Sequence, residues 1–220
     1  MIRKPNISPK KLPRQRRAIA TVDALLEAAT YILAKQGLAG FTANKVAEKA
    51  GVNIASLYQY FPNKEALLFH IVQQTWARQL ERLAPILARP DPNHAEKLRD
   101  FLREFFLTEA AEVDLRRALR TAAIDLRETE EFKALLSEGA TLIRNFIAEA
   151  VGGEAVEDLE FVVDFVVLLT TSFAERTTDA GTNGTRLIQQ ADVLTEMLVR
   201  QFGFTGGGSC RGSSIRLHKG

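Results

Sequence analysis

A stretch from residue 42 to residue 67 constrains the fold of this 220-residue chain more than any other feature. Apolar side chains recur at helical spacing over residues 46–50, and Gly51 then interrupts the pattern. Asn53 is a good N-cap for a second short helix, and a third helix can begin at Lys64. Two short helices joined by a turn that contains glycine form a helix-turn-helix. The sequence therefore predicts this motif close to its N-terminal end.

The same stretch resembles the DNA-binding segment of the TetR family of transcriptional repressors. The positions that fit the pattern of the family are Phe41, Thr42, Ala47, Ala50, Gly51, Val52, Ser56, Leu57, Tyr58, Tyr60, Phe61, Lys64, Glu65 and Leu67. The resemblance is specific for residues 18–67 and only architectural beyond them. It implies an all-α protein, in which a three-helix DNA-binding domain precedes an all-helical ligand-binding and dimerisation domain.

Charge is distributed unevenly along the chain. Residues 1–64 hold 11 Lys and Arg against 3 Asp and Glu, a net charge of +8, and residues 65–220 hold 18 against 24, a net charge of −6. A basic head on an acidic body is typical of a nucleic-acid-binding protein with a separate body. The alternative is an unstructured basic tail that only favours solubility.

The basic residues begin at the N-terminal end. Residues 1–17 contain seven basic and no acidic side chains, with Pro5, Pro9 and Pro13 among them. Such a composition predicts a disordered basic arm that lies on phosphates or enters a minor groove. A charged leader without a binding role is the alternative.

The remaining chain divides into three parts. We predict a helix-turn-helix domain over residues 18–66, a helical body over residues 67–204 and a flexible tail over residues 205–220, which is either native or an appended sequence. Pro85 predicts a kink or an end just before it. A β-branched run over residues 161–171 is the one candidate strand, but its helical flanks favour a helix. Apolar periodicity predicts the long helices at 18–36, 64–85, 94–109, 113–127, 130–151, 157–176 and 185–202.

A recognition helix must present its exposed side chains to base edges in the major groove. Gln59 is the best candidate for direct reading, because its amide can pair with adenine. The resemblance implies backbone contacts for Tyr58, Tyr60 and Lys64, and contacts to phosphate or base for Thr42 and Asn44; packing is the alternative for both tyrosines. The predicted DNA-binding residues are Arg16, Arg17, Thr42, Asn44, Asn53, Ala55, Ser56, Tyr58, Gln59, Tyr60 and Lys64.

The helix at 157–176 is apolar nearly all round, so it must be covered on all faces. A partner subunit is the natural cover, although a fully internal core helix is the alternative. The resemblance implies a homodimer that forms through the last two helices as a four-helix bundle. The predicted interface residues are Val163, Val167, Leu194 and Leu198.

The resemblance also implies a cavity for a small, mainly apolar effector among the middle helices. Arg120 and Asp125 would be its polar anchors, whereas aromatic residues at helical spacing more often form an ordinary core than a binding site. The candidate lining is Trp76, Phe101, Phe105, Phe106, Arg120, Ile124, Asp125, Phe146 and Phe165.

Other classes of protein find little support in the sequence. Three histidines without helical pairing, and no phosphate loop or catalytic triad order, argue against an enzyme, a metal site or a cofactor. The apolar run at 161–169 is too short for a membrane span, and we expect a cytoplasmic location. The sequence thus predicts a ligand-responsive repressor that binds a palindromic double-stranded DNA operator as a dimer. A helical ligand-binding or protein-interaction module with a vestigial helix-turn-helix is the alternative.

Overall fold

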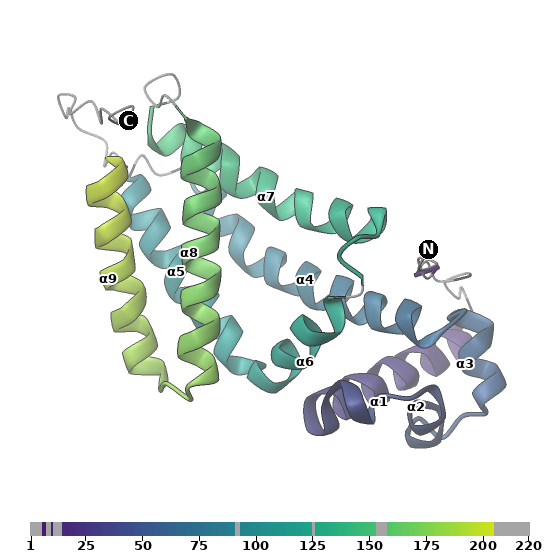
Figure 1. Cartoon of the computed structure of the whole chain (residues 1–220). Helices are drawn as coiled ribbons and strands as arrows, with labels where there is room; N and C mark the ends of the chain where they lie inside the picture. Colours follow the sequence, from purple (N-terminus) through teal and green to yellow (C-terminus); the bar gives the residue numbers. More distant parts are fainter. Residues whose placement is uncertain are drawn as a thin grey trace.

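The computed structural model describes residues 6–7, 10, 15–90, 93–124, 126–152 and 158–204. Every regular element in these ranges is a helix, which confirms the all-α prediction (Figure 1). The β-branched run at 161–171 is part of a helix and not a strand. The helices are α1 (Arg16–Gly40), α2 (Ala43–Lys49), α3 (Ile54–Tyr60), α4 (Lys64–Ala88), α5 (His94–Ala111), α6 (Val113–Ala123), α7 (Glu130–Ala150), α8 (Leu159–Asp179) and α9 (Gly184–Phe202). The predicted tail at 205–220 lies outside the described residues.

Short polar side chains begin most of these helices. An N-cap oxygen accepts a hydrogen bond from a backbone N–H of the first turn, which satisfies a group that has no partner inside the helix. This explains why the predicted starts agree with the observed ones to within about two residues. The capping residues are Thr42, Asn53, Asn63, Asn93, Thr129, Asp158 and Asn183.

Helix ends agree less well with the sequence prediction. Gly37 has φ 63° and interrupts α1 where its end was predicted, but one further turn continues to Gly40. Pro85 lies inside α4, which runs on to Ala88, so an end before the proline is wrong. A proline removes only one hydrogen bond of the helix, and the packing of Leu83 and Leu87 in the body holds the last turn in place.

Two hydrophobic cores organise the molecule. The head core contains residues of α1, α2, α3 and the first turns of α4, together with the apolar face of α6. The body core joins the end of α4 to α5, α7, α8 and α9. Since α6 packs along α1, the head core extends into the segment that we assigned to the body from the sequence.

Helix α4 runs from the head into the body, whereas α8 and α9 lie side by side at the edge of the molecule farthest from α2 and α3 (Figure 1). Head and body are therefore connected by the continuous helix α4 and by the packing of α6 on α1, and Phe132 at the start of α7 adds a further contact with the head core.

Candidate nucleic-acid interface

The helix-turn-helix consists of α2, a tight turn and α3. Thr42 caps α2 through a hydrogen bond from the Lys45 N–H to its Oγ1 (3.3 Å), and Asn53 caps α3 through one from the Ala55 N–H to its Oδ1 (2.8 Å). Gly51 has φ 66°, a left-handed conformation that favours glycine and reverses the chain between the two helices. The side chain of Leu57 is fully buried, so α3 packs one face on the head and leaves the other exposed.

The exposed face of α3 carries the side chains that the sequence predicted to read DNA. Ala55, Tyr58 and Gln59 are exposed and Ser56 is half-buried. Asn53 is exposed as well, but its side-chain oxygen is engaged in the cap of α3. Three outward side chains at helical spacing on one short helix form a surface that fits a major groove.

The other predicted DNA-binding residues surround this surface. Thr42 and Asn44 are exposed at the start of α2, Lys64 is exposed at the first turn of α4, and Arg16 and Arg17 are exposed at the start of α1. Tyr60 differs, because it is half-buried and packs against the head core. Packing, the alternative that the sequence left open, therefore accounts for Tyr60, whereas Tyr58 has 44% of its surface exposed.

The segment before α1 was predicted to be disordered, and its described residues are packed against the head instead. Ile7 is fully buried in the head core. Asn63 Nδ2 donates a hydrogen bond to the carbonyl of Asn6 (2.9 Å), and Lys10 donates two to carbonyls at the end of α3. The segment therefore contacts the head at Asn6, Ile7 and Lys10, and disorder of the arm as a whole stays a prediction. The rest of residues 1–14 lies outside the described residues.

The residues predicted to line an effector pocket occupy different environments. Phe106 and Phe146 are buried in the body core, and the rings of Phe101 and Phe105 stack along α5 with centroids 6.2 Å apart. Two others point to solvent: 62% of the surface of Ile124 and 41% of that of Phe165, on the outer side of α8, are exposed. Trp76 is half-buried against Gly139 of α7. Arg120 lies in a cluster of ion pairs, and Asp125 lies outside the described residues.

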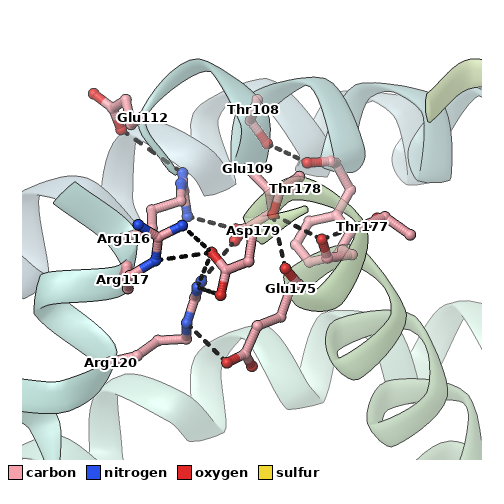
Figure 2. A network of polar contacts seen from close by, with 12 residues as sticks. Thr108, Glu109, Glu112, Arg116, Arg117, Arg120, Glu175, Thr177, Thr178 and Asp179 are labelled. Atoms are coloured by element: carbon pink, nitrogen blue, oxygen red, sulfur yellow. Dashed lines mark hydrogen bonds and ion pairs between the residues drawn. The ribbon is translucent and has the colours of Figure 1, made fainter. Parts of the chain in front are cut away.

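Arg120 belongs to a cluster of charged side chains where α5, α6 and α8 meet (Figure 2). Its guanidinium contacts Asp179 (3.0 Å) and Glu175 (3.2 Å) of α8 and lies 3.6 Å from Glu109 of α5. Three carboxylates within the chain therefore share its charge. These ion pairs do not test the predicted role of Arg120 as an anchor for a ligand, which stays a prediction.

The same cluster reaches α4 through Arg116. Its guanidinium donates to Glu109 Oε1 (2.6 Å) and to Gln79 Oε1 (3.3 Å), and Gln79 Nε2 in turn donates to Glu109 (3.0 Å) and Thr108 (3.2 Å). Gln79 is buried on α4, the helix that continues into the head. A single polar network thus connects α4 and α6, the two helices that link head and body, with α8.

The outer face of α8 and α9 is an apolar surface without a cover in the single chain. Its exposed side chains recur at helical spacing, and two open grooves of about 430 and 380 Å³ run along it. We refer to this surface as the α8–α9 face; it contains Phe161, Phe165, Leu168, Val193 and Met197, which have 41–67% of their surface exposed.

The interface residues named from the sequence lie deeper than the exposed side chains of this face, although Leu194 and Leu198 also line its two grooves. Val163, Leu194 and Leu198 are at most 5% exposed and belong to the body core, and Val167 is half-buried against it. Burial in the single chain does not test the interface, so these four residues stay a prediction.

Within the described residues, no group of three or more His, Cys, Asp or Glu side chains is arranged to hold a metal ion. None of the described helices combines the length and the apolar character that crossing a membrane requires.

Taken together, the described residues form an all-α protein with an N-terminal helix-turn-helix. Residues 25–71 match the family described as bacterial regulatory proteins, tetR family. The HTH-type transcriptional regulator CymR of Pseudomonas putida is 31% identical over 111 residues, which make up 50% of this chain and 55% of CymR. The chain thus spans about half the length of that relative.

Solved structures extend the similarity of the fold to most of the chain. The fatty acid degradation regulator FadR from Bacillus halodurans is 18% identical with a TM-score of 0.67, over 85% of this chain and 96% of that one. FadR from Bacillus subtilis, solved in complex with stearoyl-CoA, is 18% identical with a TM-score of 0.66, over 80% and 97%. Residues 25–71 thus match the TetR family of transcriptional regulators, which confirms the resemblance for the helix-turn-helix, and the solved structures have the same fold over most of the chain.

Proposed function

We propose that this chain is a ligand-responsive repressor that binds a near-palindromic DNA operator as a homodimer in the cytoplasm. The observation that carries the proposal is the exposed face of α3, where Ala55, Tyr58 and Gln59 project from a helix whose opposite side is fixed in the head core. Each subunit would place α3 in one of two successive major grooves, which lie about 34 Å apart.

Basic side chains around α3 support this orientation. Arg16, Arg17 and Lys64 are exposed on elements that flank the helix-turn-helix, and cations there would bind phosphates and fix the register of α3 on the duplex. Lys64 also lies at the N-terminal turn of α4, where free N–H groups favour an anion.

The α8–α9 face supports the homodimer. Large exposed apolar surfaces mark interaction sites, and a second copy of the chain offers the same face in return. Two helices from each subunit would then form a four-helix bundle at the edge of the molecule away from α2 and α3, which leaves both recognition helices free to bind DNA (Figure 1).

The effector in this proposal is a small, mainly apolar compound bound in the body. The stearoyl-CoA complex of a protein with the same fold supports this chemical class. Binding would have to favour the conformation that does not fit DNA, because only differential affinity shifts an equilibrium. The polar network around Glu109 and Arg116 offers a path, since it connects α5 and α8 with both α4 and α6.

Selection from a randomised DNA library with the full chain tests the proposal. We expect an enriched inverted repeat whose half-sites are centred about one helical turn apart. Enrichment of a single half-site would exclude the dimeric mode of binding. No enrichment at all would favour the alternative, a ligand-binding or protein-interaction module with a vestigial helix-turn-helix.

Fluorescence of Trp76 tests the effector, because it is the one tryptophan of the chain and lies on α4. Stearoyl-CoA, titrated with and without the selected duplex, should bind more weakly when DNA is present, and DNA more weakly when the acyl-CoA is present, by the same factor of about 5 to 150. Equal affinity in both titrations would make the compound a cargo and not an effector.

A further inference from the structure

At the C-terminal end of α3, one backbone carbonyl has no N–H donor within its own helix. The Phe61 N–H bonds the Leu57 carbonyl (2.9 Å), as in a regular helix. The next N–H in the series would belong to residue 62, but Pro62 has none, so the carbonyl of Tyr58 has no donor from its own helix. In a helix of seven residues each end group is a large fraction of the total, and such a helix is marginal by itself.

Lys10 provides donors at this end from 48 positions upstream. Its Nζ donates to the Tyr58 carbonyl (3.0 Å), which is the group left without a donor by Pro62. Its backbone N–H donates to the Tyr60 carbonyl (2.9 Å). A positive charge at the C-terminal end of a helix is also favourable for the helix dipole.

Two contacts hold Lys10 in this position. Ile7 is fully buried in the head core and anchors the segment. Asn63 contacts both the segment before α1 and the start of α4. Its Nδ2 donates to the Asn6 carbonyl (2.9 Å), and its Oδ1 accepts from the Ala66 N–H (2.7 Å). The segment is therefore connected to the end of α3 and to the beginning of α4.

We propose that Lys10 is a positioning residue for DNA recognition, which acts as a C-cap of α3 and keeps this helix at a fixed angle to the head. The proposal rests on the proposed function, since it states how the chain orients the side chains that read bases. It differs from the predicted role of the basic arm, because a residue whose ammonium caps a helix contributes to specificity and not only to attraction for phosphates.

DNA binding by variants of the full chain separates these roles. Lys10→Met keeps the aliphatic stem but removes the ammonium, and it should weaken the selected duplex by about 3- to 10-fold, the value of one hydrogen bond. A scrambled duplex of equal length should be bound almost as before, and the slope of log K against log salt should not change. Lys10→Arg should restore most of the discrimination.

Two further variants serve as matched controls. Ile7→Ala removes the anchor without a change of charge, and it should reduce discrimination in the same way as Lys10→Met. Lys11→Met removes the same charge one position later, and it should leave the ratio of selected to scrambled affinity unaltered. If Lys10→Met weakens both duplexes equally and makes the salt slope shallower by about 0.9, Lys10 is a phosphate contact and the proposal is wrong.

Amide hydrogen exchange without DNA tests the cap independently of function. Amides of α3 should exchange about 3- to 10-fold faster in Lys10→Met, whereas those of α1 should not change. Unaltered exchange in α3 would overturn the proposal even if DNA binding were affected. If exchange rises as expected but the unmodified chain binds no DNA, the cap is confirmed and the proposed function fails.

Discussion

At the scale of single residues, the proposed function assigns some side chains of the head to reading DNA and others to attracting it. Gln59 is exposed on α3, and its amide offers both a donor and an acceptor to a base edge. Lys64 has half of its side chain exposed at the start of α4 and only a distant carboxylate, Glu65, at 4.0 Å. Neither role follows from charge or exposure alone, because the position of each residue relative to α3 decides what it can contact.

Substitution of these two residues should give different patterns of binding. Gln59→Ala should relax discrimination at one base position per half-site, with a loss of about 1–3 kcal/mol for the preferred base. Lys64→Ala should weaken selected and unrelated DNA alike. Binding measurements on duplexes with single base changes check both, and a change of preference caused only by Lys64→Ala would reverse the assignment.

At the scale of elements, α6 is the part of the fold that connects head and body most closely. Its apolar face contributes to the head core, and its arginines contact α5 and α8. Arg116 and Glu109 form the most enclosed pair of the network, with 11% and 12% of their side chains exposed. Arg117 contacts Asp179 from a position where half of its side chain is in water.

We therefore expect unequal effects from two similar substitutions in α6. Arg116→Met leaves Glu109 enclosed without its main partner and should lower the free energy of unfolding by roughly 2–4 kcal/mol. Arg117→Met, the matched control, should cost less than about 1 kcal/mol, because its ion pair is screened by water. Denaturant titration measures both, and equal losses would show that enclosure does not govern this network.

The ion pair between Arg103 of α5 and Asp192 of α9 predicts that the stability of the fold depends on pH. The Arg103 guanidinium donates to both carboxylate oxygens of Asp192 (2.7 and 2.8 Å), and this hydrogen bonding holds the pKa of Asp192 below its ordinary value. A carboxyl whose pKa is lowered by folding contributes stability above its unfolded pKa of about 4 and loses it as the pH falls through the folded value.

Asp192→Asn should accordingly destabilise the protein at neutral pH and make progressively less difference as the pH falls below about 4, where the unfolded chain takes up the proton first and the folded chain follows at its lower pKa. Asp23→Asn, at an exposed position on α1, is the control for the chemical change. Thermal unfolding at several pH values checks the prediction. A loss of stability that is the same at pH 7 and pH 3 would show that the Arg103 pair does not cause it.

At the scale of the whole molecule, we propose that the α8–α9 face joins two subunits and so determines how two heads reach one DNA. Leu168→Glu places a charge where 67% of the leucine is exposed in the single chain, so the subunit should fold but fail to associate. Ile124→Glu, at a position exposed by 62% away from this face, should remain dimeric. Sedimentation velocity checks both, and a dimer formed by Leu168→Glu would place the interface elsewhere.

Interactions between residues that are close in the sequence could be predicted, and interactions between residues that are far apart in it could not. Caps such as Asn53 and breaks such as Gly37 act within a few residues, so helix boundaries and the helix-turn-helix could be predicted from local sequence. The partners of Arg120 on α8 lie 55 and 59 positions away, those of Lys10 lie 48 and 50 positions away, and no periodicity reveals them. The phase of α8 could not be predicted either, since apolar residues occur on all of its sides.

The central claim, that the exposed face of α3 reads DNA, is tested most directly by equilibrium binding of the full chain to the selected duplex and to a scrambled one over a series of salt concentrations. The account predicts that the selected duplex binds at least about a thousand-fold more tightly at physiological salt, and that log K for both falls linearly with log salt. Equal affinity for the two duplexes, or binding that salt does not weaken, would contradict it.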